Sequence, residues 1–294
     1  MKILVVVGTR PEAIKMAPVI LALKKEPWAE VRVLATAQHR HMLDQVLNFF
    51  EITPDIDLDI MRPNQALTTL TARLLLDLDD VLLAESPDVV LVQGDTTTVM
   101  TVALACFYHR IPVGHVEAGL RTGDMQNPFP EEANRVITGR LARWHFAPTE
   151  SSRQNLLKEG VHNSDITVTG NTVIDALFMT AEKDLDLGIA IDQSKRLILV
   201  TSHRRENFGE PFQNICRAIH TLANRNPDVQ FLYPVHPNPN VKDVAHQMLG
   251  SSPNIHLCEP LDYAPFVAAM QRSYLIISDS GGVQEEAPAL GKPV

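Results

Sequence analysis

The sequence predicts an α/β protein with two Rossmann-like domains that face a cleft, and three observations support this class. Short apolar runs typical of buried parallel strands alternate with helical periods along nearly the whole chain. The alternation breaks at a weakly patterned segment, residues 185–195, and then restarts. With 294 residues and 45% hydrophobic content, the chain can bury at least one large core and has room for two domains. We expect these domains at 1–170 and 196–294, joined by a helix and linker at 171–195.

Apolar runs define the strands expected in both domains. In the first domain they cover residues 2–7, 31–36, 88–93, 112–116, 145–149 and 166–170, with helices such as 12–25 and 67–85 between them. A helix from 171 to about 184 precedes the second domain, whose strands are expected at 196–203, 229–236, 254–260 and 274–280. Such nearly continuous apolar strands are covered on both faces. The last residues, 291–294, resemble a turn and the start of a further strand, so we expect the second domain to be truncated.

The composition argues against several classes of function. A net charge of −9 disfavours a nucleic-acid groove, although a few local cations can still bind an anionic small molecule. No apolar run approaches the roughly 20 residues that span a bilayer, so no membrane partner is expected. Cys106, Cys216 and Cys258 lie far apart in apolar segments, which indicates reduced thiols in a cytoplasmic protein. The histidines show no metal-ligand spacing with Cys or Asp, and no metal is expected.

Two carboxylates stand where α/β sheets place ligand chemistry. Glu117 directly follows the apolar run 112–116, and Asp95 closes the run 88–95. The carboxyl ends of parallel strands meet at one edge of the sheet, where ligands bind. Glu131 and Glu132 lie beyond a glycine-bearing loop, at the expected start of a helix. Asp95 has a second interpretation as the cap of the following helix, a role that a neighbouring threonine could also fill.

Cations after the first strand predict an anion site. Pro11 suits the first position of a helix, which places Arg10 at the helix mouth and Lys15 about one turn inside. Together with free backbone N–H groups, these side chains would attract phosphate or carboxylate. The junction carries neither the dinucleotide fingerprint nor the P-loop pattern. The alternative is a solvated Arg and Lys on a surface helix.

Two segments of the second domain predict a nucleotide site. Residues 203–206, His-Arg-Arg-Glu, end its first strand and offer cations to a diphosphate. Ser280, Gly281 and Gly282 join a strand to a helix, and glycines let the backbone approach a phosphate at a helix N-terminus. The paired acids Glu285 and Glu286 follow, and a Glu about one turn after the glycines is well placed to accept from a ribose diol. The alternatives are a solvated arginine pair and an ordinary glycine-rich turn. The two halves together suit a nucleotide sugar better than a hydride cofactor.

Nine segments, in order along essentially the whole chain, carry a resemblance to a known family. They are GTRPEAIKMAP (8–18), TAQHR (36–40), GDTTT (94–98), VGHVEAGLRTGD (113–124), PEEANR (130–135), TGNTVIDAL (169–177), HRREN (203–207), YPVHPNP (233–239) and DSGGVQEEAP (279–288). Each is modest alone, but the ordered set closely resembles the bacterial non-hydrolysing UDP-N-acetylglucosamine (UDP-GlcNAc) 2-epimerases.

The resemblance implies a glycosyltransferase-B-like fold and a homodimer. It implies interconversion of UDP-GlcNAc and its C2 epimer UDP-ManNAc, without cofactor or metal, by elimination of UDP to 2-acetamidoglucal and re-addition. The product would supply ManNAc for surface polysaccharides. Relatives continue past residue 294 with a strand and a loop whose Arg approaches the substrate, so the resemblance implies low activity for this chain. The rivals are a UDP-sugar glycosyltransferase of the same fold, a hydrolysing epimerase and an inactive UDP-binding fragment.

The resemblance also assigns roles to individual residues. The acid and the base would be among Asp95, Glu117 and Glu131, and the resemblance does not say which is which. The catalytic His203 would neutralise the departing diphosphate together with Arg10 and Lys15. The UDP moiety would be held by these groups: Ser280, Gly281 and Gly282 on phosphate, Glu286 on the ribose, Leu261 and Phe266 beside the uracil. A second, activating UDP-GlcNAc would contact Gln38, Glu131, Arg204 and His236. His41 stands where some relatives carry Gln, which departs from the pattern of that second site.

Overall fold

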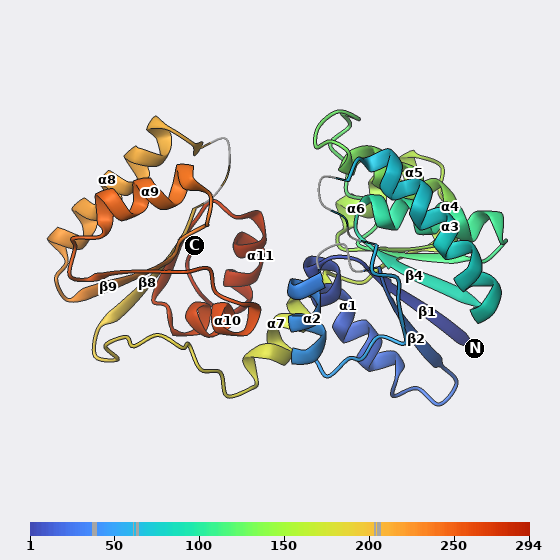
Figure 1. Ribbon diagram of the computed structural model, residues 1–294, viewed down its shortest axis with the longest axis horizontal. Helices are drawn as coiled ribbons and strands as arrows, with labels where there is room; N and C mark the ends of the chain where they lie inside the picture. Colours follow the sequence, from blue (N-terminus) through green and yellow to red (C-terminus); the bar gives the residue numbers. More distant parts are fainter. Residues whose placement is uncertain (37–39, 61, 63–64, 203, 205–206) are drawn as a thin grey trace. The chain divides into compact units, whose positions relative to one another are not determined.

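The protein forms two compact units, Met1–Ala176 and Leu177–Val294, each of which is an α/β structure (Figure 1). The computed structural model describes residues 1–36, 40–60, 62, 65–202, 204 and 207–294. The division between the units falls within helix α7 (Thr172–Ala181), inside the segment predicted to connect the domains.

Unit 1 contains a seven-stranded sheet whose paired strands are all parallel, in the order β3-β2-β1-β4-β5-β6-β7. Its strands are β1 (Lys2–Val7), β2 (Glu30–Ala35), β3 (Ile56–Asp57), β4 (Val89–Gln93), β5 (Val113–Val116), β6 (Trp144–Ala147) and β7 (Ile166–Val168). The six predicted strands agree with these to within about two residues at each end. The two-residue β3 was not predicted, because so short a segment has no readable period.

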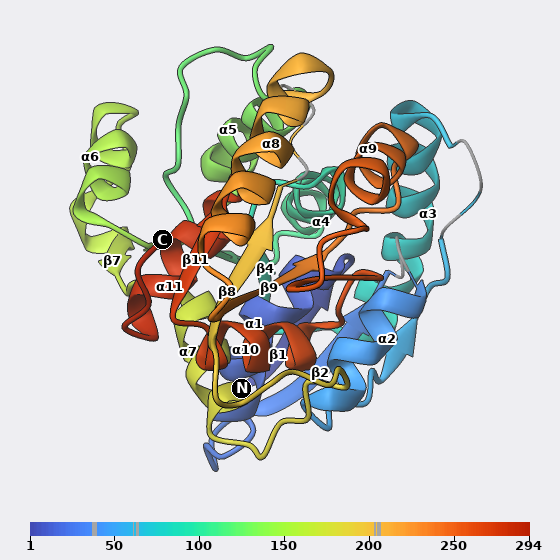
Figure 2. The same ribbon diagram turned by 90° about the vertical axis from the view of Figure 1, so that its left-hand side faces the viewer.

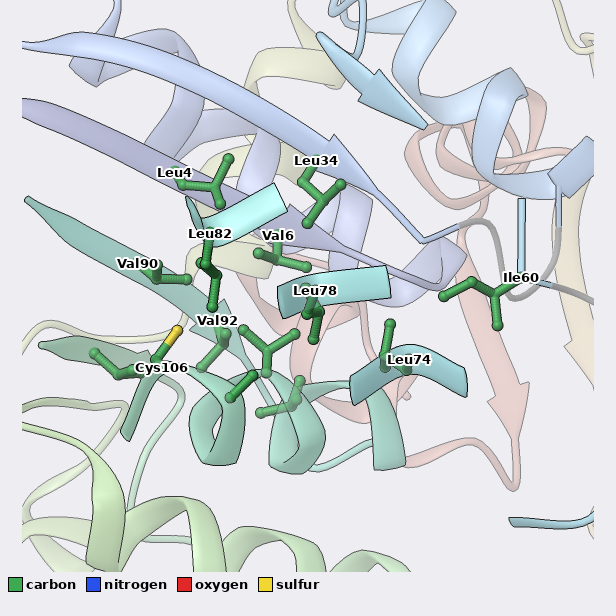
Figure 3. Close-up of a cluster of buried hydrophobic side chains, with 14 of the residues drawn as sticks. Leu4, Val6, Leu34, Ile60, Leu74, Leu78, Leu82, Val90, Val92 and Cys106 are labelled. Carbon is green, nitrogen blue, oxygen red and sulfur yellow. The ribbon is translucent and has the colours of Figure 1, made fainter. Parts of the chain in front are cut away.

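Helices connect the strands of unit 1. They are α1 (Arg10–Leu23), α2 (Arg40–Phe49), α3 (Leu67–Glu85), α4 (Thr97–Tyr108), α5 (Glu131–Leu141) and α6 (Glu150–Lys158), with a short 3₁₀ turn at Asn163–Asp165. Leucines repeat on α3 at helical spacing, and Leu74, Leu78 and Leu82 pack on Val90 and Val92 of the sheet and on α4 (Figure 3). Burial of this apolar face fixes α3 and α4 on one side of the sheet.

Unit 2 contains a four-stranded parallel sheet in the order β10-β9-β8-β11. Its elements are β8 (Arg196–Thr201), α8 (Glu210–Arg225), β9 (Val229–Pro234), α9 (Pro239–Leu249), β10 (Ile255–Cys258), α10 (Tyr263–Arg272), β11 (Leu275–Ser278) and α11 (Gly281–Ala289). One core packs α8 and α9 on the sheet, and another packs α10 and α11 on it, so helices cover both faces (Figures 1 and 2). This two-sided burial agrees with the nearly continuous apolar strands.

Both sheets reverse their strand order once. In unit 1 the neighbours β1 and β4 are the strands at which the order reverses, and in unit 2 they are β8 and β11. Open α/β sheets bind ligands outside the carboxyl ends of such strands, because the flanking loops diverge there. The predicted site segments follow these strands: Gly8 to Arg10 after β1, Asp95 after β4, residues 202–207 after β8 and Asp279 to Gly282 after β11.

Candidate active site

Glu117 lies at the carboxyl end of β5 and is held by three neighbours from other elements. Lys15 of α1 donates to both carboxylate oxygens at 2.7 Å. The Gln93 side chain, at the end of β4, also donates to Oε2, and the Asn171 amide donates to Oε1 at 3.4 Å. The Lys15 and Glu117 side chains are only 21% and 12% exposed, so this pair is a largely buried ion pair. The sequence-predicted cation and acid are therefore brought together.

The backbone of Glu117 is unusual, because its φ of 64° lies in the left-handed region. A residue with a Cβ adopts this region at a cost of about 1–3 kcal/mol, and glycine adopts it freely. Glu51 and Arg110 share this conformation, so the contact with Lys15, and not the backbone angle, places Glu117 in the candidate site.

Asp95 follows β4 and is oriented by α5. Thr96 caps α4 by accepting from the Val99 N–H, so Asp95 is not the cap. Its Oδ2 lies 2.6 Å from Nη2 of Arg135, while the Asn134 amide donates to its backbone carbonyl at 2.9 Å. Burial raises the pKa of Asp95 above its ordinary value, and the nearby Glu117 and Glu131 charges raise it further. Arg135 and Lys15 lower the pKa.

Two adjacent glutamates open α5 and differ in their surroundings. Glu131 is half-buried, and its charge reaches Asp95. Glu132 is buried, with a side chain only 1% exposed. Its Oε1 accepts from the backbone N–H groups of Thr122 and Gly123, both at 3.0 Å. The predicted helix start is confirmed, and Glu132 fixes the loop between β5 and α5.

Arg10 is the first residue of α1 and Pro11 the second, so the helix begins one residue earlier than the prediction from Pro11. A capping box fixes this helix start: the Thr9 hydroxyl accepts from the Glu12 N–H, and the Glu12 carboxylate accepts from the Thr9 N–H at 3.3 Å. The same carboxylate also accepts from the Gly8 N–H at 2.5 Å. Burial raises the pKa of Glu12. A Cβ on Gly8 would lie 2.7 Å from the Thr36 hydroxyl, so only glycine fits between β1 and that side chain. This packing sets the N-terminus of α1 beside the sheet edge.

Asp279, which follows β11, accepts hydrogen bonds from residues that follow β8, the neighbouring strand in unit 2. Its Oδ2 accepts from the Ser202 hydroxyl at 2.9 Å, the Arg204 backbone N–H at 3.1 Å and the Asn207 amide at 2.9 Å. One carboxylate oxygen at the end of β11 thus binds Ser202, Arg204 and Asn207, which follow β8. A Cβ added to Gly281 would lie 3.4 Å from the Arg204 guanidinium, so this cation lies beside the predicted phosphate turn.

The remaining predicted groups of unit 2 lie around α11 and α10. Ser280 precedes α11 without a side-chain capping bond, and Gly281 and Gly282 are exposed in its first turn. Leu261 and Phe266 pack with Val283 and Ala287 of α11 in one core. Glu286 is half-buried, and its charge raises the pKa of Tyr263 after burial, which is the larger cause. The residues predicted to contact the ribose and the uracil therefore lie within the same part of unit 2.

Of the residues predicted for the second, activating site, Glu131 belongs to unit 1, and Arg204 and His236 belong to unit 2. His236 is exposed after β9, and its Nδ1 accepts from the Asn238 N–H at 3.2 Å. Gln38 and the catalytic candidate His203 lie outside the described residues. In the described part of the chain, no group of three or more His, Cys, Asp or Glu side chains could hold a metal ion. Among those same residues, no helix is both long and apolar enough to cross a bilayer.

Sequence reasoning gave no individual role to several residues of this site: Gln93, His115, Glu132, Arg135, Asn171 and Asp279. His115 is buried in β5, and its Nε2 lies 2.7 Å from the Gly94 carbonyl, next to Asp95. Burial lowers the pKa of His115 to about 4, so the ring is neutral and donates to that carbonyl. Their positions in the sequence could have pointed to some of these residues. Gln93 ends an apolar strand, and Glu132 and Arg135 are four residues or fewer from Glu131.

Comparisons with known proteins agree on one family. A family model described as UDP-N-acetylglucosamine 2-epimerase matches residues 21–294. A UDP-N-acetylglucosamine 2-epimerase of Yersinia pestis is 59% identical over all of this chain and 81% of its own length. The crystal structure of a Neisseria meningitidis UDP-GlcNAc 2-epimerase bound to UDP-GlcNAc matches with a TM-score of 0.89 and 53% identity, covering 100% of this chain and 82% of that one. A lipopolysaccharide outer core galactosyltransferase, 14% identical with a TM-score of 0.57, shares the fold alone and covers 100% of this chain and 79% of that one.

Proposed function

The chain belongs to the UDP-N-acetylglucosamine 2-epimerase family, and we propose that it interconverts UDP-GlcNAc and UDP-ManNAc by the non-hydrolysing route. The observation that supports this most is the placement of Asp95 and Glu117 at one sheet edge, each paired with its own cation. Epimerisation at C2 needs a group that takes a proton and a group that returns one. The UDP-GlcNAc bound to the Neisseria meningitidis relative supports the choice of substrate.

The proposed reaction has two halves that mirror each other. In the first, a carboxylate takes the C2 proton, the C–H electron pair forms the C1–C2 double bond, and the C1–O bond breaks. Its electron pair leaves with the β-phosphate, which gives UDP and 2-acetamidoglucal. In the second half the phosphate oxygen bonds to C1 again and an acid returns a proton to the opposite face of C2. Acid and base are drawn from Asp95, Glu117 and Glu131, and positioned groups of this kind contribute roughly 10²- to 10⁴-fold each.

Cations stabilise the departing diphosphate in this proposal. Arg10 at the N-terminus of α1 and Lys15 one turn inside would meet the negative charge that develops on the β-phosphate. Lys15 already pairs with Glu117. If Glu117 takes up a proton and loses its charge, the Lys15 charge becomes available to the phosphate. His203 is proposed for the same role and lies outside the described residues.

Unit 2 is proposed to hold the UDP moiety. The first turn of α11 presents exposed Gly281 and Gly282, whose N–H groups suit a phosphate, and Ser280 adds a hydroxyl. Glu286 would accept from the ribose, and the apolar Leu261 and Phe266 would border the uracil. The proposal requires this nucleotide grip and the carboxylates of unit 1 to meet the same substrate molecule.

Incubation with UDP-GlcNAc alone in D₂O, followed by proton NMR, tests the function. We expect UDP-ManNAc to form and both epimers to carry deuterium at C2. A glycosyltransferase would leave UDP-GlcNAc unchanged without an acceptor, and a hydrolysing epimerase would accumulate free ManNAc and UDP. Tight UDP binding without any C2 exchange would indicate an inactive UDP-binding chain. Each of these three outcomes contradicts the proposal.

The wider roles also remain proposals. We propose that the product feeds surface polysaccharide synthesis in the cytoplasm, consistent with the three free cysteines. Activation by a second UDP-GlcNAc would involve Gln38, Glu131, Arg204 and His236. A sigmoidal rate dependence on UDP-GlcNAc that His236→Ala makes hyperbolic would support this regulation, and a hyperbolic dependence in the unmodified chain would contradict it.

We propose a homodimer that uses α3 and α4. Leu76 and Leu83 on α3 are 72% and 62% exposed, and Phe107 and Tyr108 at the end of α4 are 58% and 68% exposed. The two helices pack against each other in unit 1. Exposed apolar side chains can mark interaction sites, and the proposed dimer would cover these four. Sedimentation should give a dimer that Leu76→Glu with Phe107→Glu converts to monomer, whereas a monomer in the unmodified chain would contradict the proposal.

A further inference from the structure

Arg135 touches a proposed acid–base carboxylate directly and has no role in the function so far. It lies on α5, just after Glu131 and Glu132, and its Nη2 is 2.6 Å from Oδ2 of Asp95. Its side chain is 12% exposed, whereas the Asp95 side chain is 31% exposed. The guanidinium therefore approaches Asp95 from the protein interior and leaves part of the carboxylate accessible.

Arg135 is itself held from behind by a buried acid. Its Nε lies 3.5 Å from Oε2 of Glu132, whose side chain is 1% exposed. The other oxygen of Glu132 accepts from the Thr122 and Gly123 N–H groups. The contact between Glu132 and Arg135 is an ion pair without a hydrogen bond, and the two backbone donors fix the carboxylate that makes it. The loop hydrogen bonds, the Glu132–Arg135 ion pair and the Arg135–Asp95 ion pair thus follow one another from the loop to Asp95.

Two proposed acid–base carboxylates at this sheet edge each have their own cation. Lys15 donates to both oxygens of Glu117, and Nη2 of Arg135 lies 2.6 Å from Oδ2 of Asp95. We propose that Arg135 is a positioning residue for Asp95, which holds this carboxylate in the orientation that exchanges the C2 proton. This inference rests on the proposed epimerase function and deepens it by naming the group that orients one acid–base carboxylate.

Electrostatics support the same role. The charged groups that act on Asp95 come from three elements: Arg135 and Glu131 on α5, Glu117 after β5 and Lys15 on α1. Burial and the two glutamates raise the pKa of Asp95, and the two cations lower it. Lys15 is already bonded to Glu117, and Arg135 is the larger of the two lowering effects. Loss of Arg135 should therefore leave Asp95 protonated at a higher pH than in the unmodified chain.

Arg135→Gln and Arg135→Lys, compared with Arg143→Gln, test the proposal. Arg143 follows α5, is 61% exposed and pairs with Asp165 at 3.6 Å, so its loss should leave activity unchanged. For Arg135→Gln we expect kcat to fall roughly 10²-fold, within the range of a misplaced acid–base group. The acidic limb of the kcat against pH profile should move up by about 1 to 3 pH units, because an opposite charge at this distance shifts a carboxyl pKa by that amount. Arg135→Lys keeps the charge, so it should keep the limb near its original pH while kcat still falls.

The outcomes distinguish this inference from the function beneath it. If the unmodified chain shows no epimerisation, the proposed function fails. If the unmodified chain is active and Arg135→Gln keeps both its kcat and its acidic limb, the positioning role is overturned. A lower kcat with an unmoved limb, accompanied by a lower unfolding midpoint, also overturns it, because that result indicates only a structural role. Should Arg135→Gln fail to fold, Arg135→Lys still decides, since an unchanged kcat in that variant contradicts the need for the planar guanidinium.

Discussion

Replacement of Lys15 by methionine should destabilise unit 1 through Glu117. Removing one partner of a buried ion pair costs about 3–5 kcal/mol, because the other charge is left without compensation. Here the side chains keep 21% and 12% exposure, and Gln93 and Asn171 still donate to Glu117, so we expect about 2 kcal/mol. Adding Glu117→Gln to Lys15→Met removes the stranded charge. The double variant should therefore be more stable than the sum of the two single effects by at least about 1 kcal/mol.

Tryptophan fluorescence is a suitable assay, because the only two tryptophans, Trp28 and Trp144, both belong to unit 1. Urea unfolding followed by this signal reports on the unit that contains the pair. Lys25→Met is the matched control, since Lys25 is exposed just beyond α1 and its loss should not move the midpoint. Strictly additive single and double effects, or a Lys15→Met midpoint equal to that of Lys25→Met, would refute the reasoning.

Three further predictions concern other parts of the molecule. Asp279→Ala should weaken UDP binding about tenfold in calorimetry, because three donors lose the acceptor that they share. The unfolding midpoint followed by tryptophan fluorescence should stay unchanged, and an unaltered UDP affinity would contradict the role of this contact. Leu78→Ala, at 0% exposure in the α3 core, should lower unit 1 stability by about 3 kcal/mol in urea, and a loss under about 1 kcal/mol would contradict that packing. Burial lowers the pKa of His115 from 6.5 to about 4, so the unfolded chain binds its proton first. The stability from neutral His115 is full above pH 6.5 and falls by about 3 kcal/mol toward pH 4. His115→Gln should therefore show a shallower loss between pH 7 and pH 5, and an identical slope would refute this.

The strands and the larger helices could be predicted because their signals are local. Apolar runs such as 88–93 and 229–236 give the strands directly, and the capping residue Thr9 with Pro11 marks the start of α1. The position of the site was predictable for the same reason, since carboxyl ends of parallel strands converge whatever their order. Those features depend only on residues close together in the sequence.

The contacts within the site could not be predicted because they join residues far apart in the chain. The pair between Asp95 and Arg135 spans 40 residues, and the Glu117 side chain meets Lys15 across 102. The Asp279 contacts depend on β8 and β11 being neighbours, which the sequence does not state. The positive φ of Glu117 likewise has no sequence signal, because glutamate rarely adopts it. The sequence thus predicts which residues lie at the site, but only the tertiary structure shows which of them pair.

Isotope scrambling in the substrate tests the central claim most directly. The proposed route breaks the bond between C1 and the bridging oxygen and then remakes it, so the departing phosphate has time to rotate. With ¹⁸O in the bridging position of UDP-GlcNAc, the account predicts that label moves into the nonbridging oxygens of the β-phosphate, alongside deuterium entry at C2. Epimerisation with C2 exchange but with the label retained in the bridge would contradict elimination of UDP.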